Sequence, residues 1–135
     1  MEPPRITSPF ELLGGEAPVR ALAERFYDVM EADEPALVAV HAQDAPGKVS
    51  RHTRDRFALF LVGWLRGPPE YVRLHGQPRL RMRHRHVAIG TELRDAWLRA
   101  MEKALDAEGV HGDLRRFLSE RFAQLADHMR NREGA

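Results

Sequence analysis

Apolar residues recur at helical spacing in four separate stretches of the chain, and this periodicity constrains the fold more than any other feature of the sequence. The stretches cover residues 19–30, 53–64, 93–105 and 114–129. Spacings of three and four residues place apolar side chains on one face of an α-helix. No stretch alternates apolar and polar residues between hairpin turns, as a half-buried strand would. The sequence therefore predicts an all-α fold in which the helices cross around a shared core.

Capping and breaking residues predict where the helices begin and end. Ser8 and Pro9 indicate the start of a short helix, because serine caps a helix N-terminus and proline suits its first position. Gly14-Gly15 is expected to end that helix, since glycine is the usual residue after a helix C-terminus. Pro18 is expected to open the next helix and Ser50 to cap a third.

The length and charge of the chain fit a single globular domain. With 135 residues, we expect one domain over residues 8–131, between a loose tail at 1–7 and a frayed C-terminus at 132–135. Lys and Arg together number 21 against 20 for Asp and Glu, so the formal net charge is +1. A chain with such balanced charge is not built as a general polyanion binder.

The sequence lacks certain residue types and motifs, and their absence excludes several kinds of site. The chain has no cysteine, which excludes disulfides, cysteine-ligated zinc and iron–sulfur clusters. It has no P-loop, no G-x-G-x-x-G and no G-x-S-x-G motif, so the common nucleotide-binding and hydrolase sites are not expected. No apolar run approaches the roughly 20 residues of a membrane span and no signal-peptide pattern opens the chain, so we expect a soluble cytoplasmic protein.

A basic run from Arg79 to His86 is the most distinctive local feature. It lies within residues 70–89, where Gly76 and Pro78 predict irregular structure. Three roles fit the run: a solvated surface segment, a nucleic-acid patch, or an arginine site for a carboxylate or phosphate group. The near-zero net charge and the lack of interleaved aromatic residues count against the nucleic-acid patch.

Histidines and polar aromatic residues supply the other candidate site residues. His84 and His86 lie two residues apart, which is a poor helical spacing for holding one metal ion together, so at most one of them should face a site. Tyr27 and Trp97 fall on or beside apolar helix faces. They are either core residues whose O–H and N–H find backbone partners, or donors that project into a cavity.

Five short motifs follow one another in order along most of the chain. They are Leu13-Gly14-Gly15, Arg25-Phe26-Tyr27, Phe60-Leu61 followed by Gly67-Pro68, Leu80-Arg81-Met82-Arg83-His84, and Ile89-Gly90 with Arg94-Asp95-Ala96-Trp97-Leu98. Their order, and the spacing of thirteen residues from His84 to Trp97, resemble those of the group II truncated haemoglobins. Two positions depart from the family pattern: Arg66-Gly67 stands in place of two glycines, and Gly76-Gln77-Pro78 in place of Gly-His-Pro.

The resemblance implies a truncated globin fold, a two-over-two helical sandwich around a haem. It implies that His84 is the proximal iron ligand and that His86 is not. Since the chain has no cysteine for covalent attachment, the implied cofactor is haem b. The other residues implied to bind the haem are Arg79, Arg81, Arg83 and Tyr71, which suit the carboxylate edge, and Phe57 and Trp97.

On the distal side, the resemblance implies that polar side chains surround the bound ligand. The implied hydrogen-bond donors are Trp97, Tyr27 and His41. Thr53 stands where other globins carry a distal histidine, and Phe57, one turn further on, is implied to line the cavity. The neighbouring His52 is expected to point outward, because the apolar stripe of this helix runs through Thr53.

The implied function is reversible binding of oxygen, or of another diatomic ligand such as nitric oxide, at ferrous iron. Several donors around the ligand imply slow release, which suits ligand chemistry or sensing better than bulk transport. By analogy, the family also suggests nitric oxide dioxygenase or peroxidase-like activity with a reductase as partner, in a monomer or weak homodimer. The alternative hypothesis is a helical interaction module that binds nucleic acid through Arg79–Arg85.

Overall fold

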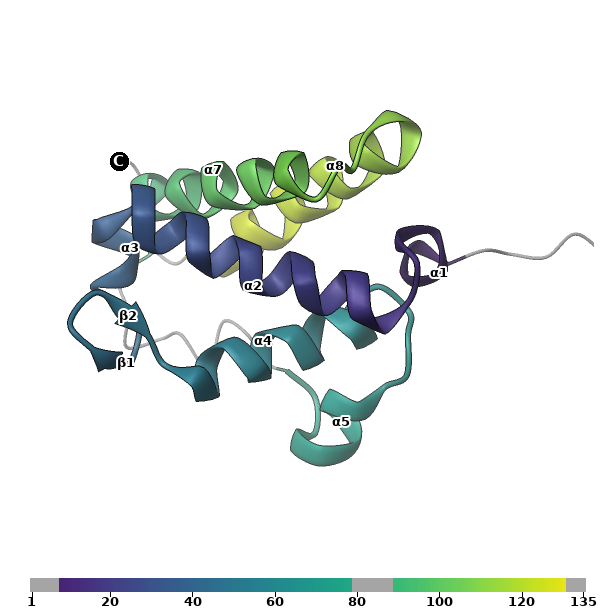
Figure 1. Cartoon of the computed structure of the whole chain (residues 1–135), viewed down its shortest axis with the longest axis horizontal. Helices are drawn as coiled ribbons and strands as arrows, with labels where there is room; N and C mark the ends of the chain where they lie inside the picture. Colours follow the sequence, from purple (N-terminus) through teal and green to yellow (C-terminus); the bar gives the residue numbers. More distant parts are fainter. Residues whose placement is uncertain (1–7, 79–88, 131–135) are drawn as a thin grey trace, which may run out of the picture.

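The computed structural model describes residues 8–78 and 89–130, and these residues are mostly helical (Figure 1). In chain order the elements are α1 (Pro9–Leu13), α2 (Glu16–Asp33), α3 (Pro35–Val38), β1 (Gln43–Ala45), β2 (Lys48–Val49), α4 (Arg51–Trp64), α5 (Glu70–His75), α7 (Thr91–Ala107) and α8 (Gly112–Met129). The predicted tail at 1–7, the predicted frayed end at 132–135 and the basic run at 79–86 lie outside the described residues.

The four long helices pack as two layers of two. Helix α2 packs against α4 on one side and against α7 on the other, while α8 lies along α7 and α5 packs on α4 (Figure 1). The largest fully buried side chains come from all four long helices and include Leu22, Phe26, Leu61, Met101 and Phe122. The predicted all-α, two-over-two architecture is therefore confirmed. None of the helices in the described ranges is long and apolar enough to cross a bilayer.

The helix ends agree with the capping residues except at the start of α2. The hydroxyls of Ser8 and Ser50 each accept a hydrogen bond from the backbone N–H three residues further on, at 3.2 and 3.1 Å. The prediction that Pro18 opens the second helix is wrong, because α2 begins at Glu16. Proline is tolerated at this position because the first backbone N–H groups of a helix have no acceptor within the helix.

Three short elements, β1, β2 and α5, were not expected from the sequence pattern. Strands β1 and β2 form a small antiparallel hairpin whose turn includes Gly47 at φ 78°, and the Gly47 N–H donates to the Gln43 side-chain oxygen at 2.8 Å. Strands of three and two residues are too short to show alternation. Helix α5 lies in the stretch predicted to be irregular, and it ends at His75, directly before Gly76.

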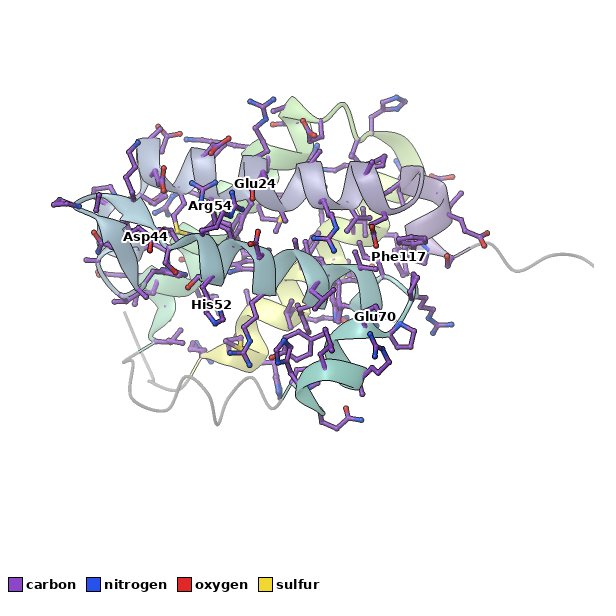
Figure 2. The ribbon with its side chains drawn as sticks, turned by 60° about the horizontal axis from the view of Figure 1, so that its bottom comes forward. Glu24, Asp44, His52, Arg54, Glu70 and Phe117 are labelled. Carbon is purple, nitrogen blue, oxygen red and sulfur yellow. The ribbon has the colours of Figure 1, made fainter. Side chains whose placement is uncertain are left out.

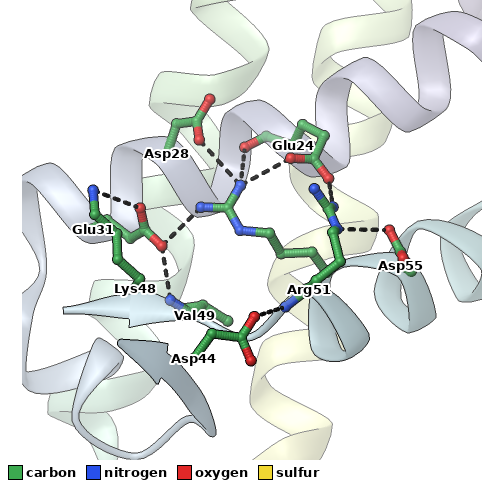
Figure 3. A network of polar contacts seen from close by, with 9 residues as sticks. Glu24, Asp28, Glu31, Asp44, Lys48, Val49, Arg51 and Asp55 are labelled. Atoms are coloured by element: carbon green, nitrogen blue, oxygen red, sulfur yellow. Dashed lines mark hydrogen bonds and ion pairs between the residues drawn. The ribbon is translucent and has the colours of Figure 1, made fainter. Parts of the chain in front are cut away.

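A buried arginine joins α4 to α2. The Nη1 of Arg54 donates to Glu24 Oε2 at 2.9 Å and to Asp28 Oδ1 at 3.1 Å, and its Nη2 lies 2.8 Å from Glu31 Oε2. Glu31 also accepts a hydrogen bond from the backbone N–H of Val49 at 2.8 Å, which extends the network to β2 (Figure 3). Because one guanidinium contacts three carboxylates from successive turns of α2, it fixes how the two helices sit together.

Candidate functional site

The main candidate site is a cavity of about 330 Å³ lined by residues of α2, α3, α4, α5, α7 and α8. Its walls are chiefly apolar and aromatic, and its volume falls at the lower end of the roughly 300–1,000 Å³ of ligand pockets in proteins. The lining residues are Tyr27, Leu37, Val40, His41, His52, Thr53, Arg56, Phe57, Phe60, Tyr71, Ile89, Leu93, Arg94, Trp97, Leu125, Ala126 and Met129. They include Tyr27, His41, Thr53, Phe57, Tyr71 and Trp97, all of which the sequence singled out.

Aromatic rings from three helices form one continuous wall of this cavity. The ring centroid of Phe57 lies 5.6 Å from that of Tyr27 and 6.3 Å from that of Trp97, with both pairs edge-on. Phe26 lies behind them, with its ring centroid 5.0 Å from both Tyr27 and Trp97. Edge-on aromatic packing restricts how each ring can rotate, so the positions of the Tyr27 hydroxyl and the Trp97 indole N–H are well defined.

Tyr27 keeps its hydroxyl proton at every physiological pH. Only 3% of this residue is exposed, and burial raises the pKa of its hydroxyl above the usual range, although the positive charge of Arg54 acts in the opposite direction. The Arg54 guanidinium lies 5.5 Å from the centre of the Tyr27 ring. Tyr27 therefore brings a stable O–H donor to the cavity wall.

The imidazole of His41, which follows α3 in the chain, is oriented by a hydrogen bond to a residue of that helix. Its Nδ1 lies 2.7 Å from the carbonyl oxygen of Leu37. Since a carbonyl oxygen only accepts, Nδ1 carries the proton of this bond, and Nε2 of the neutral ring is then an acceptor. His41 can therefore donate through Nε2 only when its ring is protonated. The predicted role of His41 as a distal donor, alongside Tyr27 and Trp97, is therefore restricted to its protonated form.

Thr53 and His52 stand next to each other on α4 but differ in exposure. The Thr53 hydroxyl is half-buried at the cavity and accepts a hydrogen bond from the Ser50 hydroxyl at 2.8 Å. His52 projects from the outer side of α4 and is exposed, as its place beside the apolar stripe predicts (Figure 2). It is nevertheless among the residues that line the cavity. A short hydroxyl at position 53 leaves more open space at this side of the cavity than an imidazole would.

Arg56, which was not expected from the sequence, lies at the cavity beside Tyr71. Its guanidinium lies 5.8 Å from the centre of the Tyr71 ring, and no acidic side chain among the described residues pairs with it. Tyr71 itself is 6% exposed. A guanidinium without an acidic partner at the edge of an apolar cavity suits a ligand that carries a carboxylate. The sequence could have indicated that Arg56 lies at the cavity, because Arg56 follows Thr53 by three residues on the same helical face.

The remaining predicted site residues lie outside the described residues. These are His84, Arg79, Arg81 and Arg83, together with His86, the histidine that the sequence reasoning set aside. The segment that carries them joins Pro78 to Ile89, and Ile89 lines the cavity.

Comparison with known proteins identifies the family. Residues 8–131 match the bacterial-like globin family. The group 2 truncated hemoglobin YjbI of Bacillus subtilis is 36% identical over 128 residues, which cover 95% of this chain and 92% of that protein. The chain is therefore a bacterial-like globin of the truncated, group II type. Since these relatives are haemoglobins, the comparisons give no support to the alternative of a nucleic-acid-binding module.

Solved structures of truncated haemoglobins share the fold of this globin. The cold-adapted truncated hemoglobin of Pseudoalteromonas haloplanktis TAC125 is 44% identical, with a TM-score of 0.85 over 93% of this chain and 99% of that chain. The truncated oxygen-avid haemoglobin of Bacillus subtilis is 36% identical, with a TM-score of 0.82 over 93% of this chain and 100% of that chain. Membership of this family means that the chain is a haem-based binder of small diatomic ligands.

The cavity has the chemistry that a haem requires. Haem is a flat, mainly apolar ring system with two carboxylates on one edge. Phe57, Phe60 and Leu93 supply apolar surface from α4 and α7, and Arg56 supplies a cation without an acidic partner among the described side chains. The described residues therefore fit the group that the globin family binds.

Proposed function

We propose that this globin binds oxygen reversibly at haem b, with His84 as the proximal iron ligand, and releases it slowly. The observation that carries the proposal is the convergence of Tyr27 and Trp97 on one mainly apolar cavity that Arg56 also lines. A truncated haemoglobin of Bacillus subtilis with the same fold is oxygen-avid, which supports the choice of ligand. When bound, haem b supplies a ferrous iron that coordinates diatomic ligands reversibly.

The side chains of the cavity hold a diatomic ligand by hydrogen bonding. The Tyr27 hydroxyl stays protonated because of its burial, and the Trp97 indole N–H is a donor that never titrates. In a cavity with mainly apolar walls such bonds are stronger than in water. Phe57 contacts both rings, fixes them relative to each other and excludes water from the space between them.

We assign the binding of the haem carboxylates to arginine side chains. Arg56 lies at the cavity next to Tyr71, and the run that contains Arg79, Arg81 and Arg83 follows α5 in the sequence. Guanidinium groups pair with carboxylates through two parallel hydrogen bonds, which orients the group as well as holding it. We therefore add Arg56 to the propionate partners expected from the sequence.

Titration of the purified protein with haemin tests the proposal. The expected result is a Soret band that saturates at one equivalent of haemin, followed after reduction and aeration by the spectrum of an oxygenated globin. Stopped-flow measurement of oxygen release then gives the dissociation rate of the same sample. A protein that takes up no added haemin would overturn the proposal.

Trp97→Phe is expected to speed oxygen release by roughly tenfold or more, because one hydrogen bond to the ligand is lost. Phenylalanine keeps the ring contacts with Phe26 and Phe122. His41→Phe is expected to change the rate by less than about threefold, since the Nδ1–H of His41 donates to the Leu37 carbonyl. Stopped-flow mixing of each oxygenated variant with carbon monoxide measures both rates. Equal effects of the two substitutions would contradict the assignment of Trp97, and not His41, as a hydrogen-bond donor to the ligand.

A further inference from the structure

A second hollow lies on the molecule away from the haem cavity. It is a groove of about 450 Å³ between the start of α1, the end of α4 and the first half of α8. Its lining residues are Ser8, Pro9, Trp64, Leu65, Arg66, Phe117, Leu118 and Arg121, and none of them lines the haem cavity. We refer to it as the Trp64 groove.

Two arginines of the Trp64 groove, Arg66 and Arg121, form no ion pair with the described residues. Ten of the thirteen arginines in residues 8–78 and 89–130 form an ion pair with an acidic side chain. The three that do not are Arg56, which lies at the haem cavity, and the groove residues Arg66 and Arg121. Arg66 and Arg121 have no such partner among the described residues, and both are exposed. Cations that lack an internal counter-charge and lie together at a hollow favour an anionic ligand.

The backbone at Arg66 supports the same conclusion. Arg66 has a φ of 72°, and it is the only residue other than glycine with a positive φ in the described part of the chain. Glycine adopts this conformation freely, whereas a residue with a Cβ is strained in it. The chain therefore carries an arginine where the backbone conformation alone favours glycine. Such a strained position points to a function of the side chain.

Aromatic surface accompanies the two cations. The Arg121 guanidinium lies 5.9 Å from the centre of the Trp64 ring, and the Phe117 side chain, which also lines the groove, is 48% exposed. The Trp64 ring stacks on Phe122, with centroids 5.0 Å apart and an interplanar angle of 26°. Phe60 also stacks on the Trp64 ring, at 6.4 Å between centroids, so only part of the indole borders the groove, next to the exposed Phe117 ring and the two arginines.

Two walls of the groove, α1 and the end of α4, are joined to each other. The backbone N–H of Phe10 donates to the carbonyl oxygen of Leu65 at 2.9 Å, which ties α1 to the end of α4. The Phe10 ring lies so close to Gly67 that a Cβ at this glycine would come within 2.5 Å of it. A ligand would thus not have to order these two walls first.

We propose that the Trp64 groove binds a planar aromatic carboxylate. The flat ring would pack on Phe117 and on the part of Trp64 that lines the groove, and the carboxylate would pair with the guanidinium groups of Arg66 and Arg121. An aromatic carboxylate fits better than inorganic phosphate, because phosphate would leave the aromatic surface of the groove uncovered. This inference does not depend on the identity of the ligand in the haem cavity.

Isothermal titration calorimetry of the haem-loaded protein with 2-naphthoate tests the proposal. We expect binding at one site, and at least about tenfold weaker binding of the neutral 2-naphthylmethanol, which lacks the charge-assisted hydrogen bonds. Arg66→Gly and Arg121→Gln are each expected to weaken 2-naphthoate binding by a similar factor. Arg116→Gln is the matched control, because Arg116 is an exposed arginine of α8 that pairs with Asp113 and does not line the groove.

The stability and the oligomeric state of the variants distinguish ligand binding from unfolding and from dimerisation. Arg66→Gly is expected to be at least as stable as the wild type in urea, since glycine relieves the positive φ, so weaker binding would not reflect unfolding. Equal affinity for the acid and the alcohol, or unchanged affinity in both arginine variants, would overturn the proposal. Sedimentation experiments could instead show a dimer that becomes monomeric in the Arg66→Gly and Arg121→Gln variants. This result would also overturn the proposal and would assign the groove to a second copy of the chain.

Discussion

Replacing His84 by alanine is expected to remove tight haem binding from this globin, whereas replacing His86 by alanine is expected to leave it intact. The reason is the coordinate bond between the proximal imidazole and iron, which the family resemblance assigns to His84. Loss of an outer-shell partner of a metal ligand already costs roughly 10–100-fold in affinity, so loss of the ligand itself should cost at least about 100-fold. Titration with haemin, followed through the Soret band, measures the affinity of both variants.

Rescue by free imidazole distinguishes a lost ligand from a misfolded protein. In His84→Gly, imidazole added to the buffer is expected to enter the vacated space and restore a spectrum close to that of the wild type. The circular dichroism of the variant without haem should match that of the wild type without haem. The assignment of His84 would be contradicted if His86→Ala lost the Soret band instead, or if His84→Ala kept it.

The helices were predictable because apolar periodicity is a local signal that burial reinforces. The long helices follow the stripes read from the sequence, and both serine caps lie where expected. The errors occurred where that signal is weak. Proline at position 18 marks a first turn but not its first residue, and strands of three and two residues carry no detectable alternation. These boundaries depend on turn geometry, which the pattern of apolar residues does not contain.

The site residues that lie on or beside an apolar helix face were predictable from the sequence. Tyr27, Trp97 and Phe57 share one cavity because each lies on or beside a buried helix face. Periodicity does not show which charged residues turn inward, and so Arg54 and Arg56 were missed. Both stand on α4 among other charged residues, and only the packing of α2 and α5 decides that one pairs with carboxylates and the other covers Tyr71. Charge pairing is a tertiary property that helical spacing alone does not reveal.

Arg54→Met is expected to lower the free energy of unfolding by about 2–4 kcal/mol, because breaking a buried ion pair leaves a buried charge without its partner. The Arg54 side chain is 10% exposed and that of its partner Glu31 is 12% exposed, so water replaces little of the lost interaction. Glu24 and Asp28 are more exposed, which keeps the expected loss below that of a fully buried cluster. Urea denaturation at pH 7 measures the difference.

Arg51→Met provides the matched control for this substitution. Arg51 stands three residues before Arg54 on the same helix and also pairs with Glu24, but its side chain is 55% exposed and its other partner, Asp55, is 63% exposed (Figure 3). An exposed ion pair contributes roughly 0–1 kcal/mol, so Arg51→Met should cost no more than about 1 kcal/mol. Equal losses in the two variants would contradict the view that burial makes Arg54 important.

The pH dependence of the same comparison tests whether charge or packing is responsible. Burial alone would raise the pKa of Glu31, but hydrogen bonds from Arg54 and from the Val49 N–H outweigh it and lower the pKa below its ordinary value. A carboxyl group whose pKa is lowered by folding stabilises the protein above its unfolded pKa of about 4.3, and this stabilisation is lost as the pH falls through the folded pKa. Without Arg54 most of that contribution disappears. The difference in unfolding free energy between wild type and Arg54→Met should therefore be widest near pH 7 and narrow below about pH 4. A difference that stays constant down to pH 3 would show that Arg54 stabilises the α2–α4 contact through the packing of its aliphatic stem.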